Sequence, residues 1–249
     1  VYQKMYDLAF IMLNCVQKGL GGTEYKDRIL GPQAYLMDRN KLKHPLFPAD
    51  LLSNVIRNIT AVMEVKSSMG VIIAAPTAGS CGCLPGTITG VGETLKLNQD
   101  VMTKGLLAAG LIGVFVSEQA TFAAEMAGCQ AECGVGSAMA AAGIVEMLGG
   151  TVEQCVDAAS FALQNITGLV CDPVANRVEV PCLGKNVMGG SNAISSAAMI
   201  LAGYDKVIPL DETILAMYDI GQKLPIELRC TLGGLGKTKT SFDIRSRLT

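Results

Sequence analysis

Thiols and charged side chains gather in one short stretch in the second half of the chain. Residues 168–186 read GLVCDPVANRVEVPCLGKN and contain Cys171 and Cys182. The charged residues of this stretch are Asp172, Arg177, Glu179 and Lys185. Thiolates bind soft metals and act as nucleophiles, and nearby charges change how readily a thiol ionises. A connector that only joined two helices would not need this chemistry, so the stretch is a candidate functional segment.

Two other pairs of cysteines stand close together in the sequence. Cys129 and Cys133 are four residues apart and would share one face of a helix, whereas Cys81 and Cys83 form a C-x-C pair. None of these spacings is a zinc-ribbon or ferredoxin pattern. Spacing alone therefore gives only a weak signal for a metal site.

The context of each cysteine separates inert thiols from functional candidates. Buried free cysteine is common and usually inert. This interpretation suits Cys15, Cys155 and Cys230. The candidates lie in turn-like or helix-end segments rich in Gly, Pro and polar residues, where a thiol can point at an ion. They are Cys129, Cys171 and Cys182.

A glycine-rich segment, AAPTAGSCGCLPG, is the second candidate site. Gly79, Gly82 and Gly86 permit positive φ and close backbone approach, and Thr77 and Ser80 supply hydroxyl groups. A run of N–H groups in such a loop, followed by a helix N-terminus, would bind a small anion such as a carboxylate or phosphate. An ordinary tight loop between helices fits the same residues equally well.

Residues for acid–base catalysis are scarce. The chain has one histidine, His44, in a polar, proline-flanked segment that suits a surface residue better than a catalyst. A hydrolase built on a Cys–His pair or a Ser–His–Asp triad therefore has almost no candidate base here. An enzyme of this composition needs a cofactor, a lysine, a carboxylate or a group from another chain for its difficult step.

Composition limits the partners and the location. The chain has 249 residues, a formal net charge of −2 and no basic block, which argues against nucleic acid. The cleanest apolar run, GLLAAGLIGVFV, is shorter than the roughly 20 residues that a bilayer requires, so we expect no membrane span. The opening VYQKMYDLAF lacks an export signal, and nine cysteines without one indicate a reducing cytoplasm.

Hydrophobic periodicity predicts one mostly helical domain. A loop is expected at 75–92, and GVIIAAP is a weak strand signal. Half of the residues are hydrophobic but only 5% are aromatic, so Gly and Ala must provide close packing. The expected helices span residues 1–20, 49–66, 101–116, 118–127, 132–148, 151–164, 187–202 and 210–222.

Four segments together resemble the α chain of the iron–sulfur-dependent L-serine dehydratase family. They are VKSSMGVIIAAPTAGSCGCLPG, EMAGCQAECGVGSAMAAAGIVEMLGGT, GLVCDPVANRVEVPCLGKNVMGGSNAI, and GLGG after ELRCT. The resemblance is strongest over residues 50–236 and treats residues 1–249 as one catalytic domain, with 237–249 as a flexible tail.

The resemblance implies an all-α fold, a single compact multi-helix domain with glycine-rich and cysteine-bearing loops. It also implies a [4Fe–4S] cluster held by three cysteines, with the fourth iron open to substrate and no pyridoxal phosphate. By motif, the ligands are Cys129, Cys171 and Cys182. Lys185 and Asn186 would lie near the cluster, Lys185 being a candidate catalytic residue. The substrate would be bound by Asn186 and by the PTAGSCG loop, which consists of Pro76, Thr77, Ala78, Gly79, Ser80, Cys81 and Gly82.

The implied activity is the conversion of L-serine to pyruvate and ammonia, a step of amino-acid degradation and gluconeogenesis. The open iron would act as a Lewis acid on the β-hydroxyl group. The general base would come from a β subunit, and the chain would form an oligomer. Two alternatives stay open: β-elimination from a related amino acid such as cysteine or threonine, and a non-catalytic subunit that carries a cluster.

Overall fold

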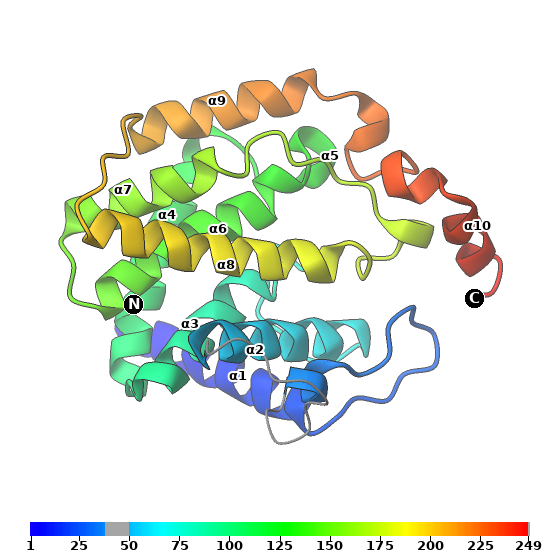
Figure 1. Ribbon diagram of the computed structural model, residues 1–249, viewed down its shortest axis with the longest axis horizontal. Coiled ribbons are helices and arrows are strands. Elements are labelled where there is room, and N and C mark those ends of the chain that lie inside the picture. The colour runs from blue at the N-terminus through cyan, green and yellow to red at the C-terminus, as the bar shows by residue number, and fades with distance from the viewer. Residues whose placement is uncertain (38–49, 249) are drawn as a thin grey trace.

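The computed structural model describes residues 1–37 and 50–248 of the chain, and these residues form an all-α fold (Figure 1). Within the described ranges no β-strand forms, and the closest approach to one is an isolated bridge between Cys171 and Arg229. The predicted fold class is confirmed. The interpretation of His44 as a surface residue falls outside the described residues.

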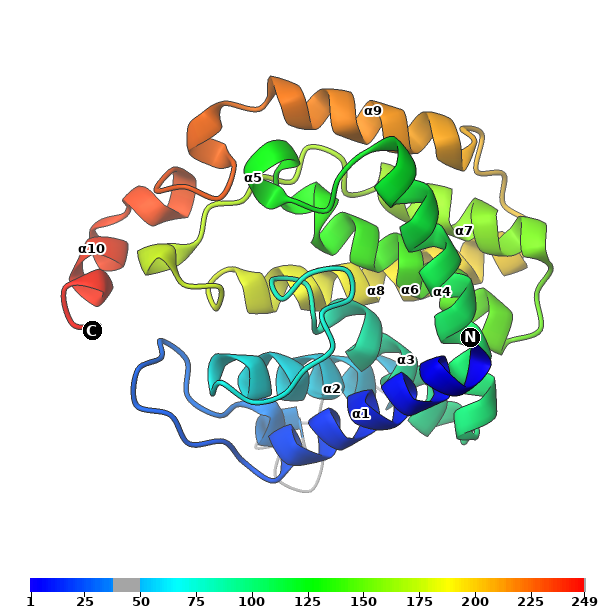
Figure 2. The same cartoon turned by 180° about the vertical axis from the view of Figure 1, so that it is seen from behind.

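Three helices form one side of the molecule: α1 (Tyr2–Leu20), α2 (Asp50–Ser67) and α3 (Cys83–Leu95). Helix α2 packs against both α1 and α3. Each helix turns an apolar face inward, and α1 buries Ala9 and Met12 along one such face. The two views in Figures 1 and 2 agree that this group lies at the edge of the molecule opposite α9.

Helix α6 (Cys133–Met147) forms the centre of the core. Every residue of α6 except Glu146 is buried, and a helix that is apolar all round must be enclosed on every side. It is surrounded by α3, α4 (Gln99–Gln119), α7 (Val152–Gln164) and α8 (Cys182–Leu201). The site described below therefore rests on the N-terminal end of a fully buried helix.

The remaining helices cover the far side and the C-terminal end. Helix α9 (Leu210–Lys223) packs against α7, α4 and the short α5 (Ala124–Ala127), and α10 (Lys239–Arg245) ends the described fold. Five short 3₁₀ helices complete the described elements. They are η1 (Ala34–Met37), η3 (Cys129–Ala131), η4 (Val174–Asn176), η5 (Ile226–Leu228) and η6 (Gly234–Lys237).

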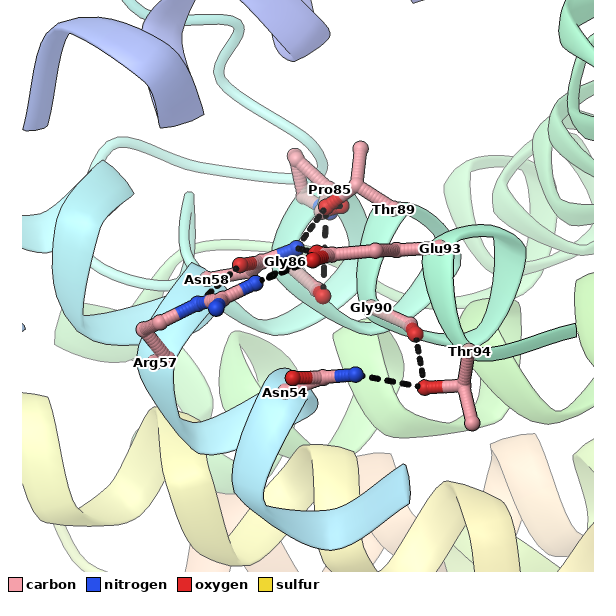
Figure 3. Close-up of polar contacts among 9 residues, drawn as sticks. All are labelled: Asn54, Arg57, Asn58, Pro85, Gly86, Thr89, Gly90, Glu93 and Thr94. Carbon is pink, nitrogen blue, oxygen red and sulfur yellow. Dashed lines mark hydrogen bonds and ion pairs between the residues drawn. The ribbon is translucent and has the colours of Figure 1, made fainter. Parts of the chain in front are cut away.

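Helices α2 and α3 approach each other closely because glycines stand at the crossing. A Cβ atom on Gly86 would lie 2.5 Å from the backbone nitrogen of Ile59, and one on Gly90 would lie 2.7 Å from the Cα of Val55. Polar contacts secure the exposed side of the same crossing (Figure 3). The Arg57 guanidinium donates to Glu93 Oε1 at 2.6 Å, so an ion pair joins the two helices.

Several expected boundaries differ from the structure. Residues 75–92 were expected to form a loop, but α3 begins at Cys83, where Asn186 Oδ1 accepts hydrogen bonds from the N–H groups of Gly82 and Cys83. Helix α8 begins at Cys182 rather than at residue 187. The chain is not helical at 120–123, so the expected helix 118–127 is split between the end of α4 and α5. GVIIAAP is not a strand, and residues 239–245 of the expected tail are helical.

Helix α4 is notable for its length and its apolar composition. It is the one helix in the described ranges that is long and apolar enough to cross a membrane, and 44% of its most apolar window is buried inside the fold. Core helices of soluble proteins often have the same length and hydropathy. The expectation that the chain has no membrane span stays a prediction.

The glycine crossing gives a prediction about stability. Replacing Gly86 with Ala forces Cβ into the Ile59 backbone, so we expect the free energy of unfolding to fall by about 1–3 kcal/mol. Gly110→Ala in α4 is the matched control, because its Cβ would meet only Met5 Cε at 3.6 Å. The control should be neutral or stabilising by up to about 1 kcal/mol. Urea unfolding of both variants measures the difference, and equal stabilities would contradict the packing argument.

Candidate active site

A cavity of about 280 Å³ brings together segments that are far apart in the sequence. It opens between the glycine-rich loop, the start of α5 and the cysteine-bearing connector before α8. Its polar and sulfur-containing lining residues are Thr77, Glu125, Glu132, Cys171, Cys182 and Cys230, and its other lining residues are Ala78, Gly79, Phe122, Ala123, Ala124, Pro173 and Val178. Of the described residues that line it, none is Lys, Arg or His.

The thiol side of the cavity depends on pairing between two distant segments. The Cys171 N–H group donates to the Leu228 carbonyl oxygen at 2.8 Å, and the Cys230 N–H group donates to the Cys171 carbonyl oxygen at 2.9 Å. Cys182 reaches the cavity as the first residue of α8. Backbone hydrogen bonds and a helix start therefore fix these three thiols in place.

Cys129 lies beside this group, on the 3₁₀ helix η3. It follows Gly128, whose φ of +75° suits a residue without a Cβ atom. Cys129, Cys133, Cys171 and Ala124 form a small buried cluster. Hydrogen bonds from the thiols of Cys133 and Cys171 hold the pKa of the Cys129 thiol well below its ordinary value. The thiolate form of Cys129 is thus stabilised by its two thiol neighbours.

Burial has the opposite effect on the pKa of the Cys182 thiol. Desolvation of its thiolate raises the pKa of the Cys182 thiol to about 12. A hydrogen bond to the Cys129 sulfur raises the pKa of the Cys171 thiol above its ordinary value. Among the described residues no three His, Cys, Asp or Glu side chains are placed to hold a single metal ion.

The glycine-rich loop is held by its own hydroxyl groups and by Glu132. The Ser80 N–H group donates to Thr77 Oγ1 at 3.2 Å, and the Thr77 hydroxyl donates to a carboxylate oxygen of Glu132. A Cβ atom on Gly79 would lie 2.5 Å from Glu132 Oε2, so only glycine allows the carboxylate to rest on this backbone. Thr77 and Gly79 therefore face the cavity beside a carboxylate.

Asn186 connects this loop with the cysteine-bearing helix. Its Oδ1 atom accepts hydrogen bonds from the N–H groups of Gly82, at 3.1 Å, and Cys83, at 2.8 Å. Its Nδ2 atom donates to the carbonyl oxygens of Gly79, at 2.9 Å, and Cys182, at 2.8 Å. Asn186 is fully buried and is absent from the cavity lining, so it holds the walls of the cavity together.

Lys185 has a similar supporting position. Its Nζ atom donates to Asp172 Oδ1 at 2.8 Å and to the Val170 carbonyl oxygen at 2.7 Å. Burial disfavours the charged form, but the hydrogen bond to Asp172 and nearby thiolates outweigh it, and the pKa of Lys185 is raised. The other Asp172 oxygen accepts from the Leu235 N–H group at 3.0 Å. The ammonium group is thus engaged with the 170–172 segment and does not line the cavity.

The predicted substrate-binding residues divide into two groups. Thr77, Ala78 and Gly79 line the cavity. Ser80 and Cys81 are fully buried, and the Cys81 thiol lies 3.8 Å from the Met63 sulfur, on the core side of the loop. Pro76, Gly82 and Asn186 do not line the cavity. The structure therefore brings the first part of the loop to the cavity and places the second part in support of it.

Three of the polar and sulfur-containing residues that line the cavity were not predicted from the sequence: Glu132, Glu125 and Cys230. Burial raises the pKa of the Glu132 carboxyl group to about 7, although the hydrogen bond from Thr77 acts to lower it. Its signal in the sequence was a carboxylate inside the apolar segment GCQAECG. Cys230 gave no local signal, because only the fold brings it to Cys171.

Comparison with known proteins identifies a family. Residues 1–235 match the family described as serine dehydratase alpha chain. The chain is 43% identical to "Probable L-serine dehydratase, alpha chain" of Bacillus subtilis, over all of this chain and 83% of that protein. It is 46% identical to the protein of the same name from Latilactobacillus sakei, over 80% of this chain and 96% of that protein. It is 34% identical to "L-serine dehydratase 1" of Escherichia coli, over 93% of this chain and 53% of that protein.

The buried amide of Asn186 gives a prediction about the architecture of the cavity. Asn186→Ala removes the Asn186 acceptor from the Gly82 N–H group and leaves the Cys83 N–H group with the Ser80 carbonyl oxygen alone, so we expect the free energy of unfolding to fall by about 2–4 kcal/mol. Asn165→Ala is the control, because that exposed side chain donates to Asn192 Oδ1 at the protein surface, and it should change stability by less than about 0.5 kcal/mol. Urea unfolding of both variants checks this. An Asn186 variant as stable as the control would contradict the bridging role.

Proposed function

Because the chain belongs to the serine dehydratase alpha chain family, we propose that it is the α chain of an L-serine dehydratase and converts L-serine to pyruvate and ammonia. The identity to the Bacillus subtilis relative extends over the whole chain, which supports a common activity. The words "alpha chain" in the names of two relatives support a β partner. A cytoplasmic location, an oligomeric state, and a role in amino-acid degradation and gluconeogenesis are parts of the same proposal.

The proposal rests on one observation: thiols, a hydroxyl-bearing loop and a carboxylate line the same cavity. The thiols of Cys171 and Cys182, the hydroxyl-bearing loop at Thr77 and the Glu132 carboxylate all line it. An L-amino acid with a β-hydroxyl group needs partners for its carboxylate, its ammonium group and its hydroxyl group. The volume of about 280 Å³ is large enough for such a molecule together with a compact cofactor.

The thiols supply the kind of ligand that an iron–sulfur cluster requires, since a [4Fe–4S] cluster is held by cysteine thiolates on separate irons. Cys171 and Cys182 line the cavity, and the buried Cys129 packs beside Cys171. The low pKa of Cys129 favours the thiolate that a cluster requires. These three residues would hold the cluster. When bound, it would supply an iron that acts as a Lewis acid on the substrate β-hydroxyl group.

The chain's own residues orient the substrate and exclude water. The loop at Thr77–Gly79 presents a hydroxyl group and backbone to the substrate carboxylate, while Phe122 and Val178 form apolar walls. Asn186 keeps this loop in register with Cys182, so the carboxylate site and the hydroxyl site stay at a fixed separation. Such positioning lowers the entropic part of the barrier.

The general base is proposed to come from the β partner. Among the described residues that line the cavity, the titratable groups are two carboxylates and three thiols, and Lys185 is already engaged with Asp172. Lys185 is therefore better suited to positioning the 170–172 segment than to removing the substrate α-proton. We expect the isolated chain to have little activity without its partner.

Activity and iron content of cysteine variants test the function. The chain is purified without oxygen, loaded with iron and sulfide, and combined with its β chain. Cys129→Ala, Cys171→Ala and Cys182→Ala should each lower pyruvate formation from L-serine by at least about 100-fold and lower bound iron in parallel. Cys155→Ala is the control, because Cys155 is buried in the core on α7 and lies outside the cavity.

Each other outcome has a distinct meaning. A loaded complex that does not act on L-serine but releases product from L-cysteine or L-threonine would change the substrate. A loaded complex that acts on none of them would favour a non-catalytic subunit. Pyruvate formation without bound iron would exclude the cluster.

A further inference from the structure

One face of helix α4 is apolar and exposed to solvent. Leu111 and Val114 are 50% and 52% exposed, although both lie within the helix rather than at its ends. The opposite face of α4 is buried against α6. Figure 2 shows α4 in front of α6, on the side of the molecule that is turned toward the viewer. An exposed patch of large apolar side chains marks a surface that another molecule can cover.

The apolar residues of this face have the spacing of a helix that packs lengthwise against another helix. They recur three and four residues apart, so they form one stripe along α4. We call this set the α4 stripe, and each of its members is exposed or partly exposed. It consists of Leu107, Ala108, Leu111, Val114 and Phe115. A second helix would therefore contact the α4 stripe along its whole length.

A charged residue stands at each end of the α4 stripe. Lys104 stands seven residues before Leu111 and Glu118 seven residues after it, so both lie on the same face of the helix as Leu111. Both are exposed. Within the part of the chain that the structure describes, neither forms an ion pair with another residue. The stripe therefore has opposite charges at equal distances from its centre.

This arrangement makes the α4 stripe complementary to itself. When two copies pack antiparallel about a two-fold axis beside Leu111, Lys104 of one copy lies opposite Glu118 of the partner subunit. Because each contact of a two-fold interface occurs twice, both ion pairs form together. A parallel arrangement would place like charges opposite each other and would be repulsive. The distribution of charge thus selects a second copy of this chain, in the antiparallel orientation.

A membrane fits the same face less well. Lys104 and Glu118 are fourteen residues apart, about 21 Å along a helix, whereas the hydrocarbon core of a bilayer is about 30 Å thick. The other face of α4 is packed against α6, so the helix is not free to enter a bilayer alone. The length of the stripe and the charges at its ends favour a protein surface as the partner.

We propose that the α4 stripe is the interface between two copies of this chain, which pack antiparallel about a two-fold axis at Leu111. The apolar side chains fill the centre of this interface. The ion pairs between Lys104 and Glu118 of the partner subunit fix the register at both ends. The proposal assigns a surface to the oligomer and does not depend on the reaction that is catalysed at the cavity.

Charge reversal with rescue tests the orientation of the two copies. Lys104→Glu and Glu118→Lys should each raise the dissociation constant of the dimer about tenfold, because each places like charges at both ends of the interface. The double variant Lys104→Glu/Glu118→Lys should restore the wild-type constant, since opposite charges then face each other again. Sedimentation velocity of the full chain over a range of concentrations, with and without the β chain, measures these constants.

A charge at the two-fold axis tests the centre of the interface. Leu111→Asp places two carboxylates side by side in an apolar contact, so it should raise the dissociation constant at least about 100-fold. Met188→Asp is the matched control, because Met188 is 40% exposed on α8, on the side of the molecule opposite α4 (Figures 1 and 2). The control should dimerise as wild type does. Circular dichroism checks that all variants are folded.

The remaining outcomes would overturn the proposal. A wild type that is monomeric at every concentration would do so, as would a double variant that associates as weakly as the single ones. Loss of β-chain binding in Leu111→Asp, without a wild-type dimer, would assign the face to the β chain instead. Binding of wild type to phospholipid vesicles that Leu111→Asp abolishes would assign it to a membrane. None of these measurements uses L-serine, so each leaves the proposed function intact.

Discussion

The hydrogen bonds of one buried amide determine how the parts of the site lie relative to one another. Asn186 accepts from the start of α3 and donates to the glycine-rich loop and to the start of α8, all without contact with solvent. A buried polar group that is fully paired fixes a single arrangement, since any shift leaves several partners unsatisfied. The separation between the loop at Thr77 and the thiol of Cys182 is therefore set by geometry rather than by flexible side chains.

The helices around this amide can come close because they present glycine and alanine to one another. Gly189 and Gly190 of α8 would collide with Cys83 and Ile59 if they carried side chains. A chain with few aromatic residues thus forms a dense core through backbone proximity. The same proximity brings the ends of α3, α6 and α8 together, and these three helix ends carry Cys83, Cys133 and Cys182.

The connector between Cys171 and Cys182 is held from three sides. Lys185 binds its beginning through Asp172, and the Ser241 hydroxyl accepts from the Ala175 N–H group at 2.8 Å. The Glu179 carboxylate accepts from the N–H groups of Ile29 and Leu30. The charged residues that made this segment conspicuous in the sequence therefore serve mainly to immobilise the thiols. A rigid frame of this kind is what a cofactor with fixed ligand spacing requires.

The sequence by itself determined the all-α class, most of the helices and the grouping of thiols in residues 168–186. These features depend on local periodicity and on neighbouring residues, which a linear sequence displays directly. The sequence analysis missed the start of α8 at Cys182 and the helix α3 inside the expected loop. Both helices have glycine or proline near their N-terminal ends, and these residues have low helix propensity. Only the tertiary structure placed Glu132 against Thr77, and Cys230 against Cys171. Those pairs are brought together by helix packing and by backbone pairing between distant segments, which no local pattern in the sequence encodes.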